Sequence, residues 1–134
     1  MSTVLYLVVP CYNEEETLPT TKDALTKLLE DMIKRDRISS KSRIVFVNDG
    51  SKDNTWSLIE KYSEENTLIK GIKLSRNKGH QNALLAGLMT VKDECDCAVS
   101  LDADLQDDIG AVEKMLEKYE EGCEIVYGVR SKRE

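Results

Sequence analysis

The sequence lacks several features that would place it in common protein classes. No apolar run approaches the roughly 20 residues that a membrane-spanning helix requires, and the N-terminus does not show the charged-then-apolar pattern of a signal peptide. Basic residues are fewer than acidic ones, and the net charge at pH 7 is −6. Nucleic-acid-binding proteins normally present a basic surface. We therefore expect a soluble, cytoplasmic chain that does not bind nucleic acid.

Zinc-binding patterns are absent as well. The cysteines are Cys11, Cys95, Cys97 and Cys123. Cys95 and Cys97 are separated by one residue, no second pair follows them, and His80 is the only histidine, so four ligands at zinc spacing are missing. We interpret the cysteines as reduced thiols, mostly small core residues.

What the sequence does contain is typical of one globular domain spanning residues 1–134. Hydrophobic residues make up 40% and charged residues 33% of the chain, and apolar segments recur along its whole length, which excludes extended disorder. Continuous apolar runs predict strands at 4–9, 44–47, 68–74, 97–101 and 125–129. Apolar residues at helical spacing, such as Leu25, Leu28, Leu29, Met32 and Ile33, predict a helix between each pair of strands. The alternation predicts an α/β fold with a mostly parallel sheet and helices on both faces.

Polar loops follow four of the predicted strands, at 10–14, 49–53, 75–79 and 102–108. The carboxyl ends of parallel strands meet at one edge of a sheet, which is where open α/β sheets bind ligands. We therefore expect these four loops to converge on one binding site.

Asp102-Ala103-Asp104 is the most specific chemical feature. In an extended segment, residues two apart point the same way, so both carboxylates could reach one ion, and Gln106 continues the alternation. These hard oxygen donors suit Mg²⁺ or Mn²⁺, which typically also bind substrate phosphates. A bound cation would let an acidic protein hold an anionic diphosphate. Taken alone, the motif also fits an ordinary solvated acidic loop.

The loops after the first two strands offer groups for a nucleoside. Tyr12 and Asn13 could flank it, and Glu14 could accept a hydrogen bond from a ribose hydroxyl, although these residues equally fit the start of a helix. Asp49-Gly50-Ser51 fits a turn before a helix cap formed by Asp53, Asn54 and Thr55, and Asp49 could also accept an N–H of the base.

The loop after the third strand carries cations. Arg76, Asn77, Lys78 and Gly79 precede a helix that begins near His80, and helix N-termini attract anions. A solvated basic turn is the alternative. His80 fits a cap or hydrogen-bonding residue better than a general base.

In order and spacing, these segments resemble family-2 glycosyltransferases, specifically the polyprenyl-phosphate branch. The matching stretches are 8–15, 47–55, 74–81, 101–107 and 127–130. The resemblance implies a truncated GT-A fold, a UDP- or GDP-linked sugar donor and a divalent metal, Mg²⁺ or Mn²⁺. It implies that Pro10, Tyr12, Glu14 and Asp49 hold the nucleoside, with Asn13, Gly50, Ser51, Arg76, Asn77, Gly79 and Ala103 also at the donor site. It assigns Asp102, Asp104 and Gln106 to the metal and diphosphate.

The resemblance also implies an inverting transfer of sugar to a polyprenyl-phosphate lipid. Family catalytic domains continue beyond Glu134, with the acceptor site, the catalytic base and membrane helices there. The parent protein would therefore act at the cytoplasmic face of a membrane, and residues 1–134 alone would be inactive. Three departures from the family pattern stand out: Asn48 for Asp, Lys78 for an apolar residue, and Asp108-Ile109 for prolines.

Two other functions remain open at this point. A family-2 glycosyltransferase could instead act on a wall or capsule polysaccharide. A phospho-receiver domain has similar length and α/β repeats, but it needs an acidic pair after the first strand, where this chain has Pro10-Cys11-Tyr12. Apolar surface left uncovered by truncation could also drive homo-oligomer formation.

Overall fold

The computed structural model describes residues 3–74, 80–91, 93–101, 112 and 114, with the side chains of 80–85 left out. Within them the order is β1 (Leu5–Cys11), α1 (Leu18–Lys34), β2 (Arg43–Asn48), α2 (Thr55–Glu65), β3 (Ile69–Lys73), α3 (His80–Val91) and β4 (Cys97–Ser100). The first four predicted strands and the three helices between them are confirmed. The predicted strand at 125–129 and the main part of the helix before it lie outside the described residues.

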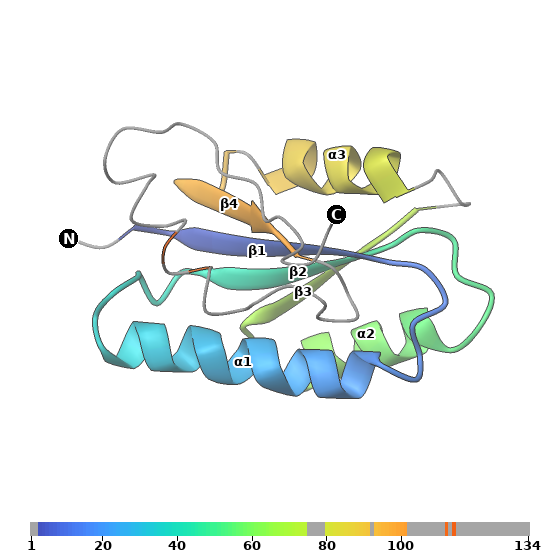
Figure 1. Ribbon diagram of the computed structural model, residues 1–134, viewed down its shortest axis with the longest axis horizontal. Helices are drawn as coiled ribbons and strands as arrows, with labels where there is room; N and C mark the ends of the chain where they lie inside the picture. The colour runs from blue at the N-terminus through green and yellow to red at the C-terminus, as the bar shows by residue number, and fades with distance from the viewer. Residues whose placement is uncertain (1–2, 75–79, 92, 102–111, 113, 115–134) are drawn as a thin grey trace.

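The four strands form one parallel sheet in the order β3-β2-β1-β4. Helices α1 and α2 cover one face of this sheet and α3 covers the other (Figure 1). The predicted α/β architecture with helices on both faces is therefore confirmed for the part of the chain that the structure describes.

Strand β1 explains why the sequence reads as a continuous apolar run. All seven of its residues are buried. Alternate side chains, Leu5, Leu7, Val9 and Cys11, belong to the core that includes the buried residues of α1 and α2. Tyr6 and Val8 belong to the core on the opposite face, together with Val91 of α3. A strand covered on both faces has no position for a solvated side chain, which removes the polar alternation.

Helix α1 begins later than the acidic residues that precede it. Its first residue is Leu18, Pro19 lies in its first turn, and the first turn contains no acidic side chain. Proline suits this position because the first N–H groups of a helix have no intrahelical acceptor. The three glutamates at 14–16 therefore belong to the loop before α1.

Two glycines allow helices to approach the sheet closely. A Cβ added to Gly71 of β3 would lie 2.6 Å from Cγ2 of Ile59 on α2. On the other face, a Cβ added to Gly87 of α3 would lie 2.8 Å from Cγ2 of Val47 and 2.9 Å from Cγ1 of Val8. Any side chain at these positions would have to push the two layers apart.

The strand order places a change of direction between β1 and β4. The chain proceeds from β1 through β2 to β3 and then returns to the other side of β1 as β4. Beyond the last strand pair, Val8–Ser100, the N–H of Leu101 donates to the carbonyl of Val8 at 3.0 Å. Open α/β sheets bind ligands at such a point, and Leu101 lies at this edge of the sheet. No helix in the described part of the chain is long and apolar enough to cross a membrane.

Candidate functional site

The candidate site is built from two loops at the carboxyl ends of neighbouring central strands. The first, residues 12–17, joins β1 to α1, and the second, residues 49–54, joins β2 to α2. The N–H of Asp49 donates to the carbonyl of Cys11 at 2.8 Å, which continues the β1–β2 pairing beyond the last strand residues. The two loops therefore leave the sheet side by side.

Asn13 makes a reciprocal pair of hydrogen bonds with the second loop. Its N–H donates to Oγ of Ser51 at 2.9 Å, and its side-chain Oδ1 accepts the N–H of Lys52 at 2.8 Å. The backbone of Asn13 is left-handed, with φ of 53°, a conformation that asparagine adopts more readily than most residues. Asn13 thus turns the first loop toward the second and fixes it there.

The next two residues of the first loop are held by the second loop and by the start of α2. The N–H of Glu14 donates to Oγ1 of Thr55 at 2.8 Å, and the N–H of Glu15 donates to Oδ2 of Asp53 at 3.3 Å. In return, Oε1 of Glu15 accepts the N–H of Asn54 at 2.8 Å. Backbone donors that lie outside any helix or strand ladder are in this way satisfied by side chains of residues 53–55.

Asp53 precedes Asn54, the N-cap residue of α2, and binds the first residue of that helix. Its Oδ1 accepts the N–H of Thr55 at 2.9 Å and the Thr55 hydroxyl at 2.5 Å. Burial acts to raise the pKa of Asp53, but the hydrogen bonds from Thr55 and Glu15 outweigh it and lower the pKa below its usual value. The predicted cap at 53–55 forms only in part: Asp53 accepts the first N–H of α2, whereas Asn54 in the N-cap position makes no side-chain capping bond.

The second loop is closed by Asn48 and Gly50. Oδ1 of Asn48 accepts the N–H of Ser51 at 3.2 Å, and its carbonyl accepts the N–H of Leu74 at 2.9 Å. Gly50 has φ of 71°, a left-handed conformation that glycine adopts without steric cost. Because an aspartate would offer the same acceptor atom, Asn48 preserves the hydrogen bond that closes this turn.

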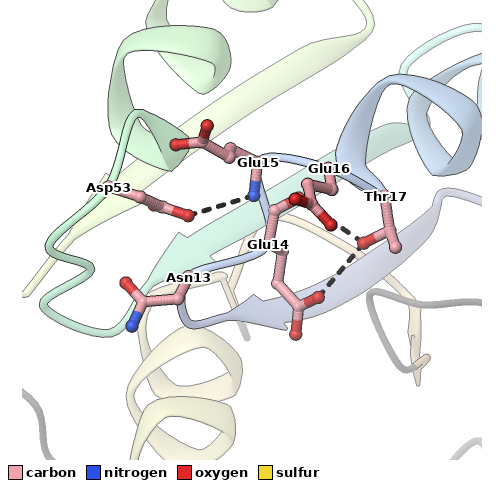
Figure 2. A pocket seen from close by; sticks show the side chains of 6 residues that line it. All are labelled: Asn13, Glu14, Glu15, Glu16, Thr17 and Asp53. Atoms are coloured by element: carbon pink, nitrogen blue, oxygen red, sulfur yellow. Dashed lines mark hydrogen bonds between the residues drawn. The ribbon is translucent and has the colours of Figure 1, made fainter.

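A cavity of about 540 Å³ lies against these loops. It is lined by Asn13, Glu14, Glu15, Glu16, Thr17 and Asp53. Figure 2 shows the Asp53 carboxylate directed at the backbone N–H of Glu15, and the Glu14 side chain beside Thr17. The Thr17 hydroxyl lies 3.1 Å from Oε1 of Glu14 and donates to it. Four of the six lining residues carry carboxylates, so the cavity favours hydroxyl and N–H donors over anions.

Seven of the predicted site residues lie in or beside this loop pair. Pro10 and Asp49 are buried, and Asp49 is only 3% exposed. Tyr12 is 37% exposed, although it is a large aromatic residue. Asn13, Glu14, Gly50 and Ser51 occupy the loops described above. An exposed ring and a buried carboxylate at one edge can provide a stacking surface and a directional acceptor.

The remaining predicted site residues lie outside the described residues: Arg76, Asn77, Gly79, Asp102, Ala103, Asp104 and Gln106. No group of three or more histidine, cysteine or acidic side chains suited to a metal occurs among residues 3–74, 86–91 and 93–101, whose side chains the structure describes. The donor set of Asp102, Asp104 and Gln106 is chemically suited to Mg²⁺ or Mn²⁺, and it follows Leu101 at the change of strand direction. The metal site stays a prediction.

Sequence reasoning did not predict the hydrogen bonds between the loops. Asp53 and Thr55 were expected to act only at the start of their own helix, and no partner was predicted for Glu15. Their cross-loop partners are 38 to 41 residues away along the chain. The aspartate two residues before a threonine was a signal for the cap, but not for its partner.

Comparison with known proteins supplies the family context. Residues 6–134 match the family model described as glycosyl transferase family 2. The chain is 53% identical over 130 residues to an uncharacterized glycosyltransferase, YkoT, of Bacillus subtilis (strain 168), covering 97% of this chain and 39% of that protein. It is 36% identical over 127 residues to the bactoprenol glucosyl transferase of Shigella phage SfX, covering 95% of this chain and 39% of the relative.

A solved structure shares the fold. The crystal structure of S. aureus TarS 1-349 in complex with UDP aligns with a TM-score of 0.58 and 22% identity, covering 87% of this chain and 33% of that one. This likeness is consistent with the GT-A type of fold expected from the sequence. The chain spans about two-fifths of the length of the curated relatives that it matches.

Proposed function

The chain belongs to glycosyl transferase family 2, and from this membership we propose that residues 1–134 are the nucleotide-sugar-binding N-terminal part of a glycosyltransferase. The curated relatives are about two and a half times as long as the matched region. The acceptor site, the catalytic base and any membrane helices belong, in this proposal, to the portion of the relatives that this chain does not match. Residues 1–134 alone then bind the donor weakly and transfer no sugar.

The main support for the proposal is the pair of loops beyond β1 and β2, which hydrogen bonds hold together. Tyr12 presents an exposed ring, Asp49 supplies an acceptor for a base N–H, and Glu14 supplies an acceptor for a ribose hydroxyl. A nucleoside needs a flat apolar surface and a few directed acceptors, and this edge has both. Uridine and guanosine each carry a ring N–H that could donate to Asp49, so both UDP- and GDP-linked sugars fit the proposal.

The acidic character of the cavity bears on the diphosphate. Glu14, Glu15, Glu16 and Asp53 would repel an anionic group placed among them. We therefore place the nucleoside near this cavity and the diphosphate toward the change of direction between β1 and β4. Asp102, Asp104 and Gln106 would hold Mg²⁺ or Mn²⁺ there, and we expect Arg76 and Asn77, from the segment after β3, at the same donor site. When bound, the cation would neutralise charge on the diphosphate as it leaves.

The acceptor in this proposal is a polyprenyl phosphate. A relative that covers 95% of this chain is named a bactoprenol glucosyl transferase. In the reaction, a phosphate oxygen of the lipid forms a bond to the anomeric carbon from the face opposite the leaving group. The bond from that carbon to the nucleotide diphosphate breaks at the same centre, so the configuration inverts. Transfer would take place at the cytoplasmic face of a membrane.

The test uses the protein extended to the length of its relatives. It is incubated with UDP- or GDP-linked radiolabelled sugars, Mg²⁺ and either a polyprenyl phosphate in detergent or a wall polysaccharide. Label in the lipid fraction supports the proposal. Label in the polysaccharide alone would show that the acceptor is a polysaccharide and not the lipid. Sugar transfer by residues 1–134 alone would contradict the assignment of the base and acceptor site to the unmatched portion.

A further inference from the structure

Three consecutive backbone N–H groups of the first loop donate to side chains of the second loop and of the first residue of α2. The N–H groups of residues 13, 14 and 15 donate to Oγ of Ser51, Oγ1 of Thr55 and Oδ2 of Asp53, at 2.9, 2.8 and 3.3 Å. Successive backbone N–H groups in a turn commonly create a site that attracts anions. Here the protein supplies the acceptors itself, and only the one from Asp53 is a carboxylate.

We propose that Asp53 is a positioning residue, which holds loop 12–17 in the conformation that binds the nucleoside. The inference rests on the proposed function, because it concerns the same site. Asp53 acts through Glu15 and Thr55 rather than by contact with the donor.

The hydrogen bonds of Asp53 support a positioning role. One carboxylate oxygen, Oδ1, accepts both the N–H and the hydroxyl of Thr55, and the other, Oδ2, accepts the N–H of Glu15. Each oxygen thus accepts at least one hydrogen bond from the protein itself. These donors come from two elements, the start of α2 and the loop before α1, so one side chain joins them. Figure 2 shows the bond from the N–H of Glu15 to Asp53.

The first loop depends on such external support. Residues 12–17 lie between β1 and α1 and belong to neither, and Asn13 holds a left-handed backbone. The return bond from the N–H of Asn54 to Oε1 of Glu15 closes a ring of hydrogen bonds between the loops. If the Asp53 acceptor is lost, the N–H of Glu15 must turn toward water, which moves the backbone between Tyr12 and Thr17.

An electrostatic role and a positioning role of Asp53 predict opposite effects on nucleotide binding. Asp53 lines the acidic cavity, so removing its negative charge should strengthen the binding of an anionic nucleotide by simple electrostatics. If Asp53 positions the loop, its removal should weaken that binding. The sign of the change therefore identifies the role.

The test compares Asp53→Asn with wild type and with Glu60→Gln. The asparagine keeps an acceptor for Thr55 but places an N–H₂ donor opposite the N–H of Glu15. Glu60→Gln removes a charge from an exposed position on α2 and serves as the matched control. Binding of UDP and GDP, with Mg²⁺ present, is measured by titration calorimetry well below the melting temperature, after circular dichroism confirms folding.

We expect Asp53→Asn to weaken the binding of the preferred nucleotide by about tenfold or more. This is the effect expected if binding must restore a loop conformation that one hydrogen bond to a charged group no longer holds. Glu60→Gln should bind as wild type does. Amide exchange measured by NMR without nucleotide should accelerate at residues 13–15 in Asp53→Asn. A variant that only destabilised the fold would lower the melting temperature and leave the affinity of the folded protein unchanged.

Equal or tighter binding by Asp53→Asn, with wild type binding normally, would overturn the positioning role and leave the proposed function standing. If wild type binds neither nucleotide, the proposed donor site itself fails, and the inference fails with it.

Discussion

Replacement of Thr55 by valine tests the loop network through stability. Thr55 is fully buried. Its hydroxyl accepts the N–H of Glu14 at 2.8 Å and donates to the carboxylate of Asp53. Valine has nearly the same shape, so Thr55→Val removes these two hydrogen bonds and leaves a methyl group in place of the hydroxyl.

The size of the destabilisation follows from the two hydrogen-bond partners that Thr55→Val leaves behind, Glu14 and Asp53. An N–H left without an acceptor costs about 1–3 kcal/mol, and a hydrogen bond to a charged group contributes about 1.5–3 kcal/mol. Burial of the new methyl group offsets about 0.8 kcal/mol. Since Glu14 and Asp53 are both half-buried, water can partly replace the lost partners, and we expect a loss of about 2 kcal/mol. For a domain of this size, that lowers the melting temperature by roughly 6–10 °C.

The assay is urea unfolding of wild type, Thr55→Val and Thr55→Ser, monitored by circular dichroism and extrapolated linearly to water. Serine keeps the hydroxyl and loses only a buried methyl group, which costs about 0.8 kcal/mol. The expected order of stability is wild type, then serine, then valine. If the valine variant is as stable as the serine variant, the hydroxyl does not hold the loops together and the reasoning fails.

Three further predictions follow from other parts of the structure. Gly87→Ala should lower the free energy of unfolding by about 1 kcal/mol, because overpacking against two strand valines outweighs the gain in helix propensity; urea unfolding that shows stabilisation would contradict the close packing of α3. The lowered pKa of Asp53 stabilises the fold above the ordinary aspartate pKa of about 3.9. The stability difference between wild type and Asp53→Asn, measured from neutral pH downward, should therefore shrink as the pH falls through the folded-state pKa, and a constant difference would show that the charge contributes nothing. Burial raises the pKa of Cys11 above its ordinary value and that of Cys95 to about 11, so both thiols should react slowly with a disulfide reagent at pH 8 in native protein and fast in urea, as mass spectrometry of the labelled peptides can show.

Much of the fold could be predicted because local patterns determine it. Strand β1 is apolar at nearly every position, since both faces of the sheet are covered, and α1 presents Leu25, Leu29 and Met32 at helical spacing on its buried side. The start of α1 was less predictable. Three successive glutamates fit a helix N-terminus by charge, yet the chain forms a turn there and the helix begins at Leu18.

Several residues of the site could be predicted, but the hydrogen bonds that hold them in place could not. Sequence motifs at strand ends indicated Tyr12, Asn13, Glu14 and Asp49, and the parallel sheet brings them together. The hydrogen bonds that hold the loops join residues almost 40 positions apart, so no local pattern contains them. They depend on the β1–β2 register, in which Cys11 lies beside Asn48; a shift of one residue would move every donor away from its acceptor.

The central claim, that this edge of the sheet binds a nucleotide with a divalent cation, is tested most directly by thermal unfolding. Wild type and Asp104→Ala are melted with UDP or GDP, with and without Mn²⁺. At one hundred times the dissociation constant, binding should stabilise wild type by about 2.7 kcal/mol, a rise of several degrees in melting temperature. We predict a rise with one nucleotide that requires Mn²⁺ and is lost in Asp104→Ala. The absence of a rise with either nucleotide at saturating concentrations, or a rise that is equal without the metal and in Asp104→Ala, would contradict the account.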